Sequence, residues 1–420
     1  MRRYIAIIMS GMLLAAACSG GGEPAEEPTP TPPSPPEEPA IPADIPFYKG
    51  TTMSFANYMQ DIGLVYRENG VQTDPYESVR RHGANVVRLQ LDMVPFDDYD
   101  GCRIDWQSYD RVVADARCAK AQGLDIVLTL KPDCDRFTAT STTHNLLPDI
   151  WQGRSDAEVG DALYDWVYES LRSLAEEDIL PVIVAVGNEV NINFLSPAGG
   201  YDAARTAVLL RRGHQAVRDY AAAYNPEVLS AVHVADPSKC DSFIATLRSA
   251  GATDYDIVAI SYYPGSDIGH KMGIYASFRS LAEYFFKAYG KRIMVLETAY
   301  SFTTGSKNGS YMGDWCNNAY NYPDWNDAAN ALNYSAAKQR EWLRSLAEDI
   351  KSGGGVGLVT WGTESLPDEA SGLADGHGKG LYTYPAAWAY GSTWENNSYW
   401  DFTDDNNLHA GIDWMLDVEE

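Results

Sequence analysis

The chain has 420 residues, of which 45% are hydrophobic and 12% aromatic, so it is long enough to bury a sizeable core. Its formal net charge of -26 argues against nucleic acid and anionic lipid surfaces as partners, because both repel an acidic protein. A neutral substrate fits this charge better, and the 11 tryptophans and 27 tyrosines include candidates for stacking on sugar rings as well as for core packing.

The N-terminus is a targeting segment. Arg2 and Arg3 precede an apolar run over residues 4–14, which is too short for a transmembrane helix and is followed by Ala15-Ala16-Ala17-Cys18. Small residues directly before a cysteine are typical of a bacterial lipoprotein signal. We therefore predict a signal peptide over residues 1–17 and lipidation of Cys18. The alternative is an ordinary secretory signal, because the three alanines also form a cleavage site.

Residues 18–45 are rich in Pro, Glu, Gly and Thr and cannot bury a core, so we expect an extended spacer behind the lipid anchor. These features predict a lipoprotein attached to the outer membrane or the cell surface. The membrane would then be contacted only through the lipid. One domain is predicted over residues 46–420, and we expect it to be monomeric.

Strand-like and helix-like patterns alternate along this domain. Asp74, Pro75, Glu77 and Gly83 mark the start and stop of the first helix clearly. Further helices are predicted at 108–122, 159–177, 203–224, 278–289 and 336–351. Strands are predicted at 47–52, 85–91, 125–130, 182–186, 228–233, 256–262, 292–297 and 355–361.

This alternation predicts an α/β protein with a (β/α)₈ TIM barrel. A doubly wound sheet is the competing arrangement, but it calls for a glycine-rich phosphate turn after the first strand, and the sequence has none there.

Two glutamates end strands of the predicted barrel. Glu189 follows the buried fourth strand after Gly187-Asn188, and Glu297 ends the seventh strand. Catalytic groups of such barrels lie at the C-terminal ends of the strands, and glycosidic cleavage needs two carboxyl groups on either side of the bond. The pair predicts a glycoside hydrolase. The alternative is that each glutamate only caps a helix or pairs with a cation.

Several short motifs add to this pattern in a fixed order. They are Lys49-Gly50, Tyr66-Arg67-Glu68-Asn69-Gly70, Gly83-Ala84-Asn85-Val86-Val87-Arg88-Leu89, Val186-Gly187-Asn188-Glu189-Val190-Asn191, Ser261-Tyr262-Tyr263-Pro264, Val295-Leu296-Glu297-Thr298-Ala299-Tyr300 and Gly391-Ser392-Thr393-Trp394-Glu395-Asn396. Through them, nearly the whole domain resembles the endo-β-1,4-galactanase family, glycoside hydrolase family 53 of clan A. The resemblance implies an endo-acting, retaining enzyme that cleaves internal β-1,4 linkages of galactan or arabinogalactan.

The same resemblance implies residue roles. Glu189 would be the acid/base, Glu297 the nucleophile, and Asn188 a partner of the sugar 2-hydroxyl group. The remaining substrate-binding positions would be Arg88, which holds the nucleophile, Tyr262, which touches its carboxylate, His233, and Trp361. From the residues alone, Arg88 is equally a structural ion-pair partner, His233 a satisfied core histidine, and Trp361 a barrel-filling side chain.

Three loops depart from the family pattern. Lys131 stands where the family has a histidine, Gly265-Ser266-Asp267 replaces an aromatic residue and a histidine, and Gly362-Thr363 replaces Glu-Pro. The sugar preference is therefore open. A retaining endo-glycanase for another neutral β-glycan and a non-catalytic surface glycan-binding protein are the alternatives.

The resemblance implies no required cofactor and no catalytic metal. The polar loop over residues 301–333 contains Asp314, Asp324 and Asp327, and the same loop holds calcium in some relatives. Its residue order matches no EF-hand, so a plain polar loop is the favoured interpretation.

Overall fold

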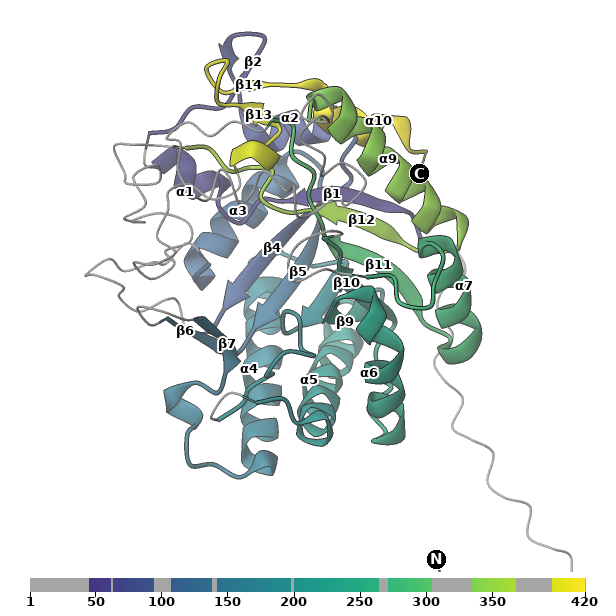
Figure 1. Cartoon of the computed structure of the whole chain (residues 1–420). Helices are drawn as coiled ribbons and strands as arrows, with labels where there is room; N and C mark the ends of the chain where they lie inside the picture. Colours follow the sequence, from purple (N-terminus) through teal and green to yellow (C-terminus); the bar gives the residue numbers. More distant parts are fainter. Residues whose placement is uncertain are drawn as a thin grey trace, which may run out of the picture. The chain divides into compact units, whose positions relative to one another are not determined.

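A closed barrel of eight parallel strands forms the centre of the molecule, which confirms the predicted (β/α)₈ fold (Figure 1). The computed structural model describes residues 45–61, 63–93, 107–137, 142–197, 200–263, 271–303, 334–367 and 395–419. Around the barrel the strands follow the order β1-β12-β11-β10-β9-β8-β5-β4. Their bounds are β1 (Tyr48–Thr52), β4 (Val86–Asp92), β5 (Asp125–Lys131), β8 (Ile183–Val186), β9 (Leu229–Ala235), β10 (Ile257–Ser261), β11 (Arg292–Glu297) and β12 (Gly357–Thr360).

Helices lie outside the strands, with α4, α5 and α6 along one side of the barrel and α7 and α9 along another (Figure 1). Their bounds are α1 (Ala56–Asp61), α2 (Pro75–Arg81), α3 (Tyr109–Ala121), α4 (Asp156–Glu176), α5 (Ala203–Ala223), α6 (Pro237–Ser249), α7 (Phe278–Tyr289), α9 (Ala336–Ser352) and α10 (Trp414–Asp417). Short 3₁₀ turns occupy η1 (Asp149–Trp151), η4 (Glu395–Asn397) and η5 (Ala410–Asp413).

Capping side chains fix where the helices begin. The Asp74 carboxylate accepts the Tyr76 amide proton at 2.9 Å, as expected for the N-cap of α2. Helix α4 begins at Asp156, three residues before its expected start, because Ser155 and Glu158 form a capping box. Helix α6 was not predicted, although Asp236 caps its N-terminus.

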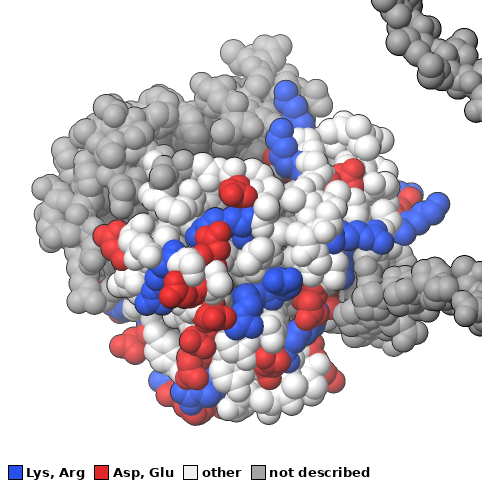
Figure 2. Space-filling model, turned by 90° about the horizontal axis from the view of Figure 1, so that it is seen from below, with Lys and Arg blue, Asp and Glu red and all other residues white. Residues whose placement is uncertain are grey.

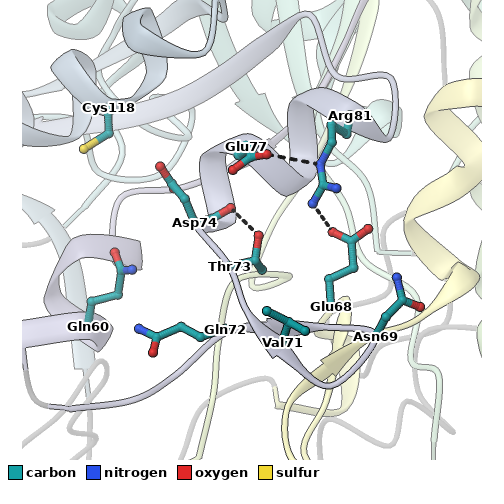
Figure 3. A pocket seen from close by; sticks show the side chains of 10 residues that line it. All are labelled: Gln60, Glu68, Asn69, Val71, Gln72, Thr73, Asp74, Glu77, Arg81 and Cys118. Carbon is teal, nitrogen blue, oxygen red and sulfur yellow. Dashed lines mark hydrogen bonds and ion pairs between the residues drawn. The ribbon is translucent and has the colours of Figure 1, made fainter.

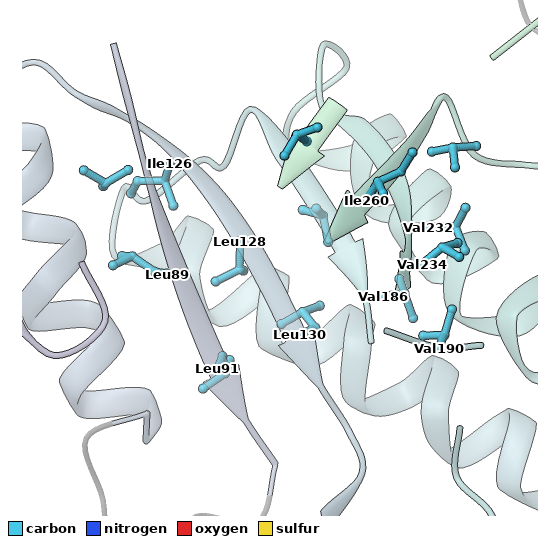
Figure 4. Close-up of a cluster of buried hydrophobic side chains, with 14 of the residues drawn as sticks. Leu89, Leu91, Ile126, Leu128, Leu130, Val186, Val190, Val232, Val234 and Ile260 are labelled. Carbon is cyan, nitrogen blue, oxygen red and sulfur yellow. The ribbon is translucent and has the colours of Figure 1, made fainter. Parts of the chain in front are cut away.

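Two apolar layers hold the barrel together. The outer layer packs strands against helices and contains side chains such as Leu89 and Leu91 of β4 and Leu128 and Leu130 of β5 (Figure 4). The inner layer fills the barrel with the alternate side chains of the same strands. It includes Val86, Val127, Ile183, Ala185, Leu229, Ala231, Ile257, Ala259 and Met294. Alternation of side chains along each strand assigns every position to one layer or the other.

Two small sheets accompany the barrel. Strands β13 (Trp400–Asp401), β14 (Asn407–Leu408), β2 (Arg67–Glu68) and β3 (Val71–Gln72) form one, and β6 (Cys134–Phe137) pairs with β7 (Thr142–Leu146) in the other. The C-terminal segment packs against the first elements of the domain. Lys49 Nζ donates to the Val418 carbonyl at 2.6 Å, and a Cβ on Gly83 would meet the Met415 backbone at 2.7 Å.

Acidic and basic side chains are interspersed over the face shown in Figure 2. Ion pairs link neighbouring helices, as between Arg205 of α5 and Asp156 of α4 at 2.7 Å, and between Arg212 and Asp161 at 2.8 Å. A membrane-spanning helix is not found among the described residues, since none of their helices is both long and apolar enough. The predicted signal peptide and most of the linker, residues 1–44, lie outside the described part of the chain.

Candidate active site

The inward side chains become polar towards the C-terminal ends of the strands. On β4, β9 and β10 an apolar inward residue is followed two positions later by a polar one. These polar residues are Arg88, His233 and Ser261, which are 2%, 0% and 0% exposed. Strand alternation therefore gathers hydrogen-bonding groups at the end of the barrel where active sites of this fold lie.

Glu297 reaches this polar layer because β11 contains an irregularity. Val295 and Glu297 pair with the consecutive residues Ile260 and Ser261 of β10, so Leu296 is an extra residue in the ladder. Leu296 faces the barrel interior, and strict alternation would turn Glu297 outwards. The bulge instead lets Glu297 contact the inward-facing Arg88, which is a known use of bulges near active sites.

Arg88 connects the two strand ends that carry the glutamates. Its Nη1 donates to Glu297 Oε2 at 2.9 Å, its Nη2 donates to Asn188 Oδ1 at 2.7 Å, and its Nε donates to Thr129 Oγ1 at 3.1 Å. Because Asn188 accepts through Oδ1, its Nδ2 is the group that would donate to a sugar hydroxyl. The expected position of Arg88 beside Glu297 is what the structure shows, and the contact of Arg88 with Thr129 was not foreseen.

Glu189 projects from a sharp turn after β8. Gly187 has a φ of 83°, and a Cβ there would lie 2.4 Å from Val190 Cγ1, so only glycine fits. Glu189 itself has a left-handed φ of 50°. Backbone conformations of this kind in residues other than glycine are uncommon and concentrate at functional sites.

The Glu189 carboxyl is enclosed although the residue as a whole is half-buried. Burial and the neighbouring charge of Glu297 raise its pKa from 4.5 to about 7. A hydrogen bond with Ser261 and the charges of His144 and Arg88 act in the opposite direction. A carboxylic acid that keeps its proton near neutral pH is suited to general acid catalysis.

The side chain that contacts the Glu297 carboxylate is that of Tyr263, whereas Tyr262 meets Glu297 only through a backbone hydrogen bond of 2.8 Å among the contacts described. The Tyr263 hydroxyl donates to Glu297 Oε1 at 3.0 Å, and burial together with the charge of Glu297 raises the pKa of Tyr263 well above its usual value. The expected contact of Tyr262 with this carboxylate was wrong. Ala259, Ser261 and Tyr263 share the inward parity, whereas the Tyr262 ring points outwards and packs 4.9 Å from Phe278.

His233 acts on the site through Ser261. Its Nε2 lies 3.0 Å from Ser261 Oγ, and Ser261 in turn shares a hydrogen bond with Glu189. The side chain is fully buried, so it is positioned to orient Ser261 rather than to meet a sugar. Trp361 directly follows β12 and is half-buried. Its amide donates to the Thr298 carbonyl at 2.8 Å, next to the nucleophile position.

Two of the loops that depart from the family pattern are described. Lys131 is 6% exposed and forms a buried ion pair with Asp133, so its charge is compensated locally. Gly362 turns the chain with a φ of 74°, and Thr363 contacts Thr51 of β1. Residues 265–267 and residues 304–333 of the polar loop, including its three aspartates, lie outside the described residues.

A separate polar pocket lies outside the barrel, between the β2–β3 hairpin, α1 and α2 (Figure 3). It has a volume of about 570 Å³, and in Figure 3 the Arg81 guanidinium points towards Glu68 and Glu77. Neither Glu189 nor Glu297 lines this pocket. Within the described ranges, no group of three or more His, Cys, Asp or Glu side chains is arranged to hold a metal ion.

Comparison with known proteins agrees with this geometry. The sequence profile of glycosyl hydrolase family 53 matches residues 48–412. The arabinogalactan endo-β-1,4-galactanase of Cellvibrio japonicus is 28% identical over 380 residues, which cover 86% of this chain and 88% of that protein. The probable arabinogalactan endo-β-1,4-galactanase A of Aspergillus terreus is 28% identical over 326 residues, or 75% and 84% of the two chains.

A solved structure, the family 53 catalytic domain of Ignisphaera aggregans, superposes with a TM-score of 0.70 at 26% identity. The superposition covers 91% of this chain and 98% of that domain. A structure of fungal β-1,4-galactanases has a TM-score of 0.64 at 20% identity and supports the fold. The family profile spans most of the chain, the barrel is closed, and two glutamates stand at the expected strand ends. This chain therefore belongs to glycosyl hydrolase family 53.

Proposed function

We propose that this glycoside hydrolase is an endo-acting, retaining β-1,4-galactanase that uses Glu189 as acid/base and Glu297 as nucleophile. The observation that carries the proposal is the Arg88 bridge, which places the Glu297 carboxylate and the Asn188–Glu189 turn around one guanidinium group. The galactan substrate is proposed from the relatives, whose names specify arabinogalactan and β-1,4-galactan linkages.

In the first step, protonated Glu189 donates its proton to the glycosidic oxygen as the bond to the anomeric carbon breaks. The Glu297 carboxylate forms a bond to that carbon from the opposite face of the sugar. Arg88 and Tyr263 hold the two oxygens of Glu297 at 2.9 Å and 3.0 Å, which orients the attacking lone pair. The leaving galactan chain departs with the proton from Glu189.

In the second step, Glu189, now ionised, removes a proton from a water molecule. The water oxygen attacks the anomeric carbon and displaces Glu297, which regenerates both carboxyl groups. Two inversions give net retention. The raised pKa of Glu189 serves the first step, and the loss of its proton during that step prepares it for the second. The proposed chemistry uses side chains of this chain alone and needs no cofactor.

The test is reducing-sugar release from linear β-1,4-galactan, with mannan, xylan, arabinan and β-glucan alongside. Wild type is compared with Glu189→Gln and Glu297→Gln, and NMR of early products reports the anomeric configuration. We expect oligosaccharides from galactan, formed first as the β-anomer, and losses of at least about a thousandfold in both variants. Activity on a different glycan would replace the substrate and keep the mechanism. Binding without any turnover would favour the surface glycan-binding protein and refute the catalytic proposal.

We further propose that the domain is monomeric and is exported as a lipoprotein anchored through Cys18 at the outer membrane or cell surface. The support is the arrangement of Arg2, Arg3, the apolar run and the alanines before Cys18. Incorporation of labelled palmitate that is lost in Cys18→Ser is expected. Labelling that persists in this variant would refute the assignment. Light scattering of the domain is expected to give the mass of one chain.

A further inference from the structure

The turn that carries Glu189 is held in a conformation that it does not favour on its own. Gly187, Glu189, Asn193 and Leu195 all have positive φ, at 83°, 50°, 53° and 53°. Three of these residues carry a Cβ, for which the left-handed region is unfavourable. The turn is neither helix nor strand, and only part of its hydrogen bonding is internal: the Ile192 amide donates to the Glu189 carbonyl at 2.9 Å, and the Ser196 amide to the Asn193 carbonyl at 2.8 Å.

One side chain supplies a donor to three of these carbonyls. Asn145 Nδ2 lies 3.1 Å from the Asn188 carbonyl, 3.3 Å from the Glu189 carbonyl and 2.8 Å from the Ile192 carbonyl. Asn145 is 3% exposed and has a φ of 59°, a conformation that asparagine adopts more readily than most residues. It belongs to β7, in the loop after β5 where the sequence departs from the family pattern.

The backbone of β7 is attached to the same turn. The Leu147 amide donates to the Ser196 carbonyl at 2.8 Å, and Leu146 forms an isolated parallel bridge with Ser196. On the other side, Asn191 exchanges hydrogen bonds of 3.0 Å and 2.8 Å with the backbone of Ala235, at the end of β9. The turn is therefore clamped between two asparagines, and at the Glu189 carbonyl Asn145 joins the Ile192 amide, which donates at 2.9 Å.

We propose that Asn145 is a positioning residue that holds the acid/base Glu189 at the distance needed for proton transfer. This inference rests on the proposed function, in which Glu189 is the acid/base. Without the amide, the three carbonyls lose a buried donor and the turn relaxes from its left-handed geometry. Proton transfer depends directly on where the turn places the Glu189 carboxyl group. Attack by Glu297 depends on the turn less, because Arg88 and Tyr263, which hold its two carboxylate oxygens, lie on β4 and just after β10 and not in the turn.

Strand β7 also comes close to the Glu189 carboxyl group, as the effect of His144, the neighbour of Asn145, indicates. His144 is exposed, and its positive charge is one of the influences that lower the pKa of Glu189, together with Arg88 and the Ser261 hydrogen bond. Burial and Glu297 outweigh these influences. The strand that positions the turn thus also borders the acid/base.

The experiment compares Asn145→Ala with a matched control, Asn85→Ala. Asn85 is a half-buried asparagine whose side chain likewise bonds to the backbone, since it donates to the Phe47 carbonyl at 3.0 Å and accepts from the Lys49 amide at 2.8 Å. It lies before β4, at the opposite end of the barrel strands. Both variants are assayed on β-1,4-galactan and on dinitrophenyl β-galactobioside, whose leaving group departs without protonation. Active sites are counted by trapping Glu297 with a 2-deoxy-2-fluoro glycoside.

Per active site, Asn145→Ala is expected to lose at least about tenfold in kcat/KM on galactan. On the dinitrophenyl substrate its kcat/KM should stay within about threefold of wild type, because that step needs no acid. Its kcat on this substrate should fall, since deglycosylation needs the base, and azide should restore it by attacking the glycosyl-enzyme directly. Asn85→Ala should leave kcat/KM at its wild-type value on both substrates, and azide should not change its kcat.

Equal losses of Asn145→Ala on both substrates, or no response to azide, would overturn the inference. Glu189→Gln is measured in parallel to separate the two proposals. If it too lacks azide rescue, the assignment of Glu189 fails. If Glu189→Gln is rescued and Asn145→Ala is not, only the role of Asn145 fails. Should Asn145→Ala not fold, Asn145→Ser retains a short donor. Its kcat/KM relative to wild type on galactan and on the dinitrophenyl substrate then decides the outcome.

Discussion

Glu364 gives a prediction about stability that can be worked out from the structure. This glutamate follows β12, is 0% exposed, and its carboxyl oxygens have no hydrogen-bond partner among the other described residues, so only its own backbone amide acts on them. Burial and the nearby charge of Asp115 raise its pKa from 4.5 to about 8. Asp115 is itself buried, accepts a 2.5 Å hydrogen bond from Tyr76, and has a pKa raised by burial to about 8.

The folded protein thus keeps a proton on Glu364 that the unfolded chain releases near pH 4.5. Below that pH both states are protonated and the folded state has its full stability. As the pH rises through the interval up to about 8, the folded state holds more protons than the unfolded state, so the free energy of unfolding falls. The slope from one such group is about 1.4 kcal/mol per pH unit. Between pH 5 and pH 7, Glu364 alone therefore lowers the free energy of unfolding by about 3 kcal/mol.

Glu364→Gln removes this titration. We expect its free energy of unfolding, relative to wild type, to rise by about 3 kcal/mol from pH 5 to pH 7, as measured by urea denaturation at several pH values. The matched control is Glu348→Gln on α9, where the glutamate side chain is 56% exposed and the substitution removes no buried carboxyl group. The reasoning is refuted if the difference in free energy of unfolding between Glu364→Gln and wild type stays constant within about 0.5 kcal/mol from pH 5 to pH 7. The Glu364 carboxyl group would then have a partner that offsets its burial.

Three further predictions concern activity. Arg88→Ala should lower kcat on galactan by at least about a hundredfold, because Glu297 and Asn188 both lose their shared donor. Full activity of this variant would mean that Arg88 is only structural. Tyr263→Phe should lower kcat by about tenfold with little effect on thermal stability, whereas Tyr262→Phe should leave kcat unchanged. A larger loss of kcat in Tyr262→Phe than in Tyr263→Phe would contradict the assigned contact. Because Glu189 must be protonated, kcat/KM should fall as pH rises through about 7, and a profile flat to pH 9 would exclude it as the acid.

Much of the fold is legible in the sequence because barrel strands are buried on both faces. All eight predicted strands end within two residues of the observed ones, and apolar runs located most of them, although β1 (Tyr48–Thr52) is not apolar. The two glutamates could be placed because they lie at the ends of such runs. Helix α6 was missed even though its signals are present. Asp236 and Pro237 mark its start, and its buried residues recur at helical spacing. The two-residue strands β2, β3, β13 and β14 are too short to leave a pattern.

The details of the site were less accessible, for two reasons. The choice between Tyr262 and Tyr263 depends on strand parity, which the sequence does contain, since Ala259, Ser261 and Tyr263 alternate. The contacts of Asn145 could not be read in the same way. Its partners are backbone carbonyls more than 40 residues away, and because every residue has a backbone carbonyl, such contacts leave no pattern in the sequence. Positive φ at Glu189 likewise follows from packing around the turn and not from its own residue type.

The pairing of β1 with β12 has a consequence for how the domain folds. Its register joins Thr51 to Thr360, and the Lys49 side chain binds a carbonyl 369 residues further along. The barrel can close only when segments from opposite ends of the domain meet, which raises contact order and slows folding. During synthesis, β1 has to wait for its second neighbour until nearly the whole domain has been made. Until then the edge of β1 that will pair with β12 stays unpaired, so the barrel stays open at this seam.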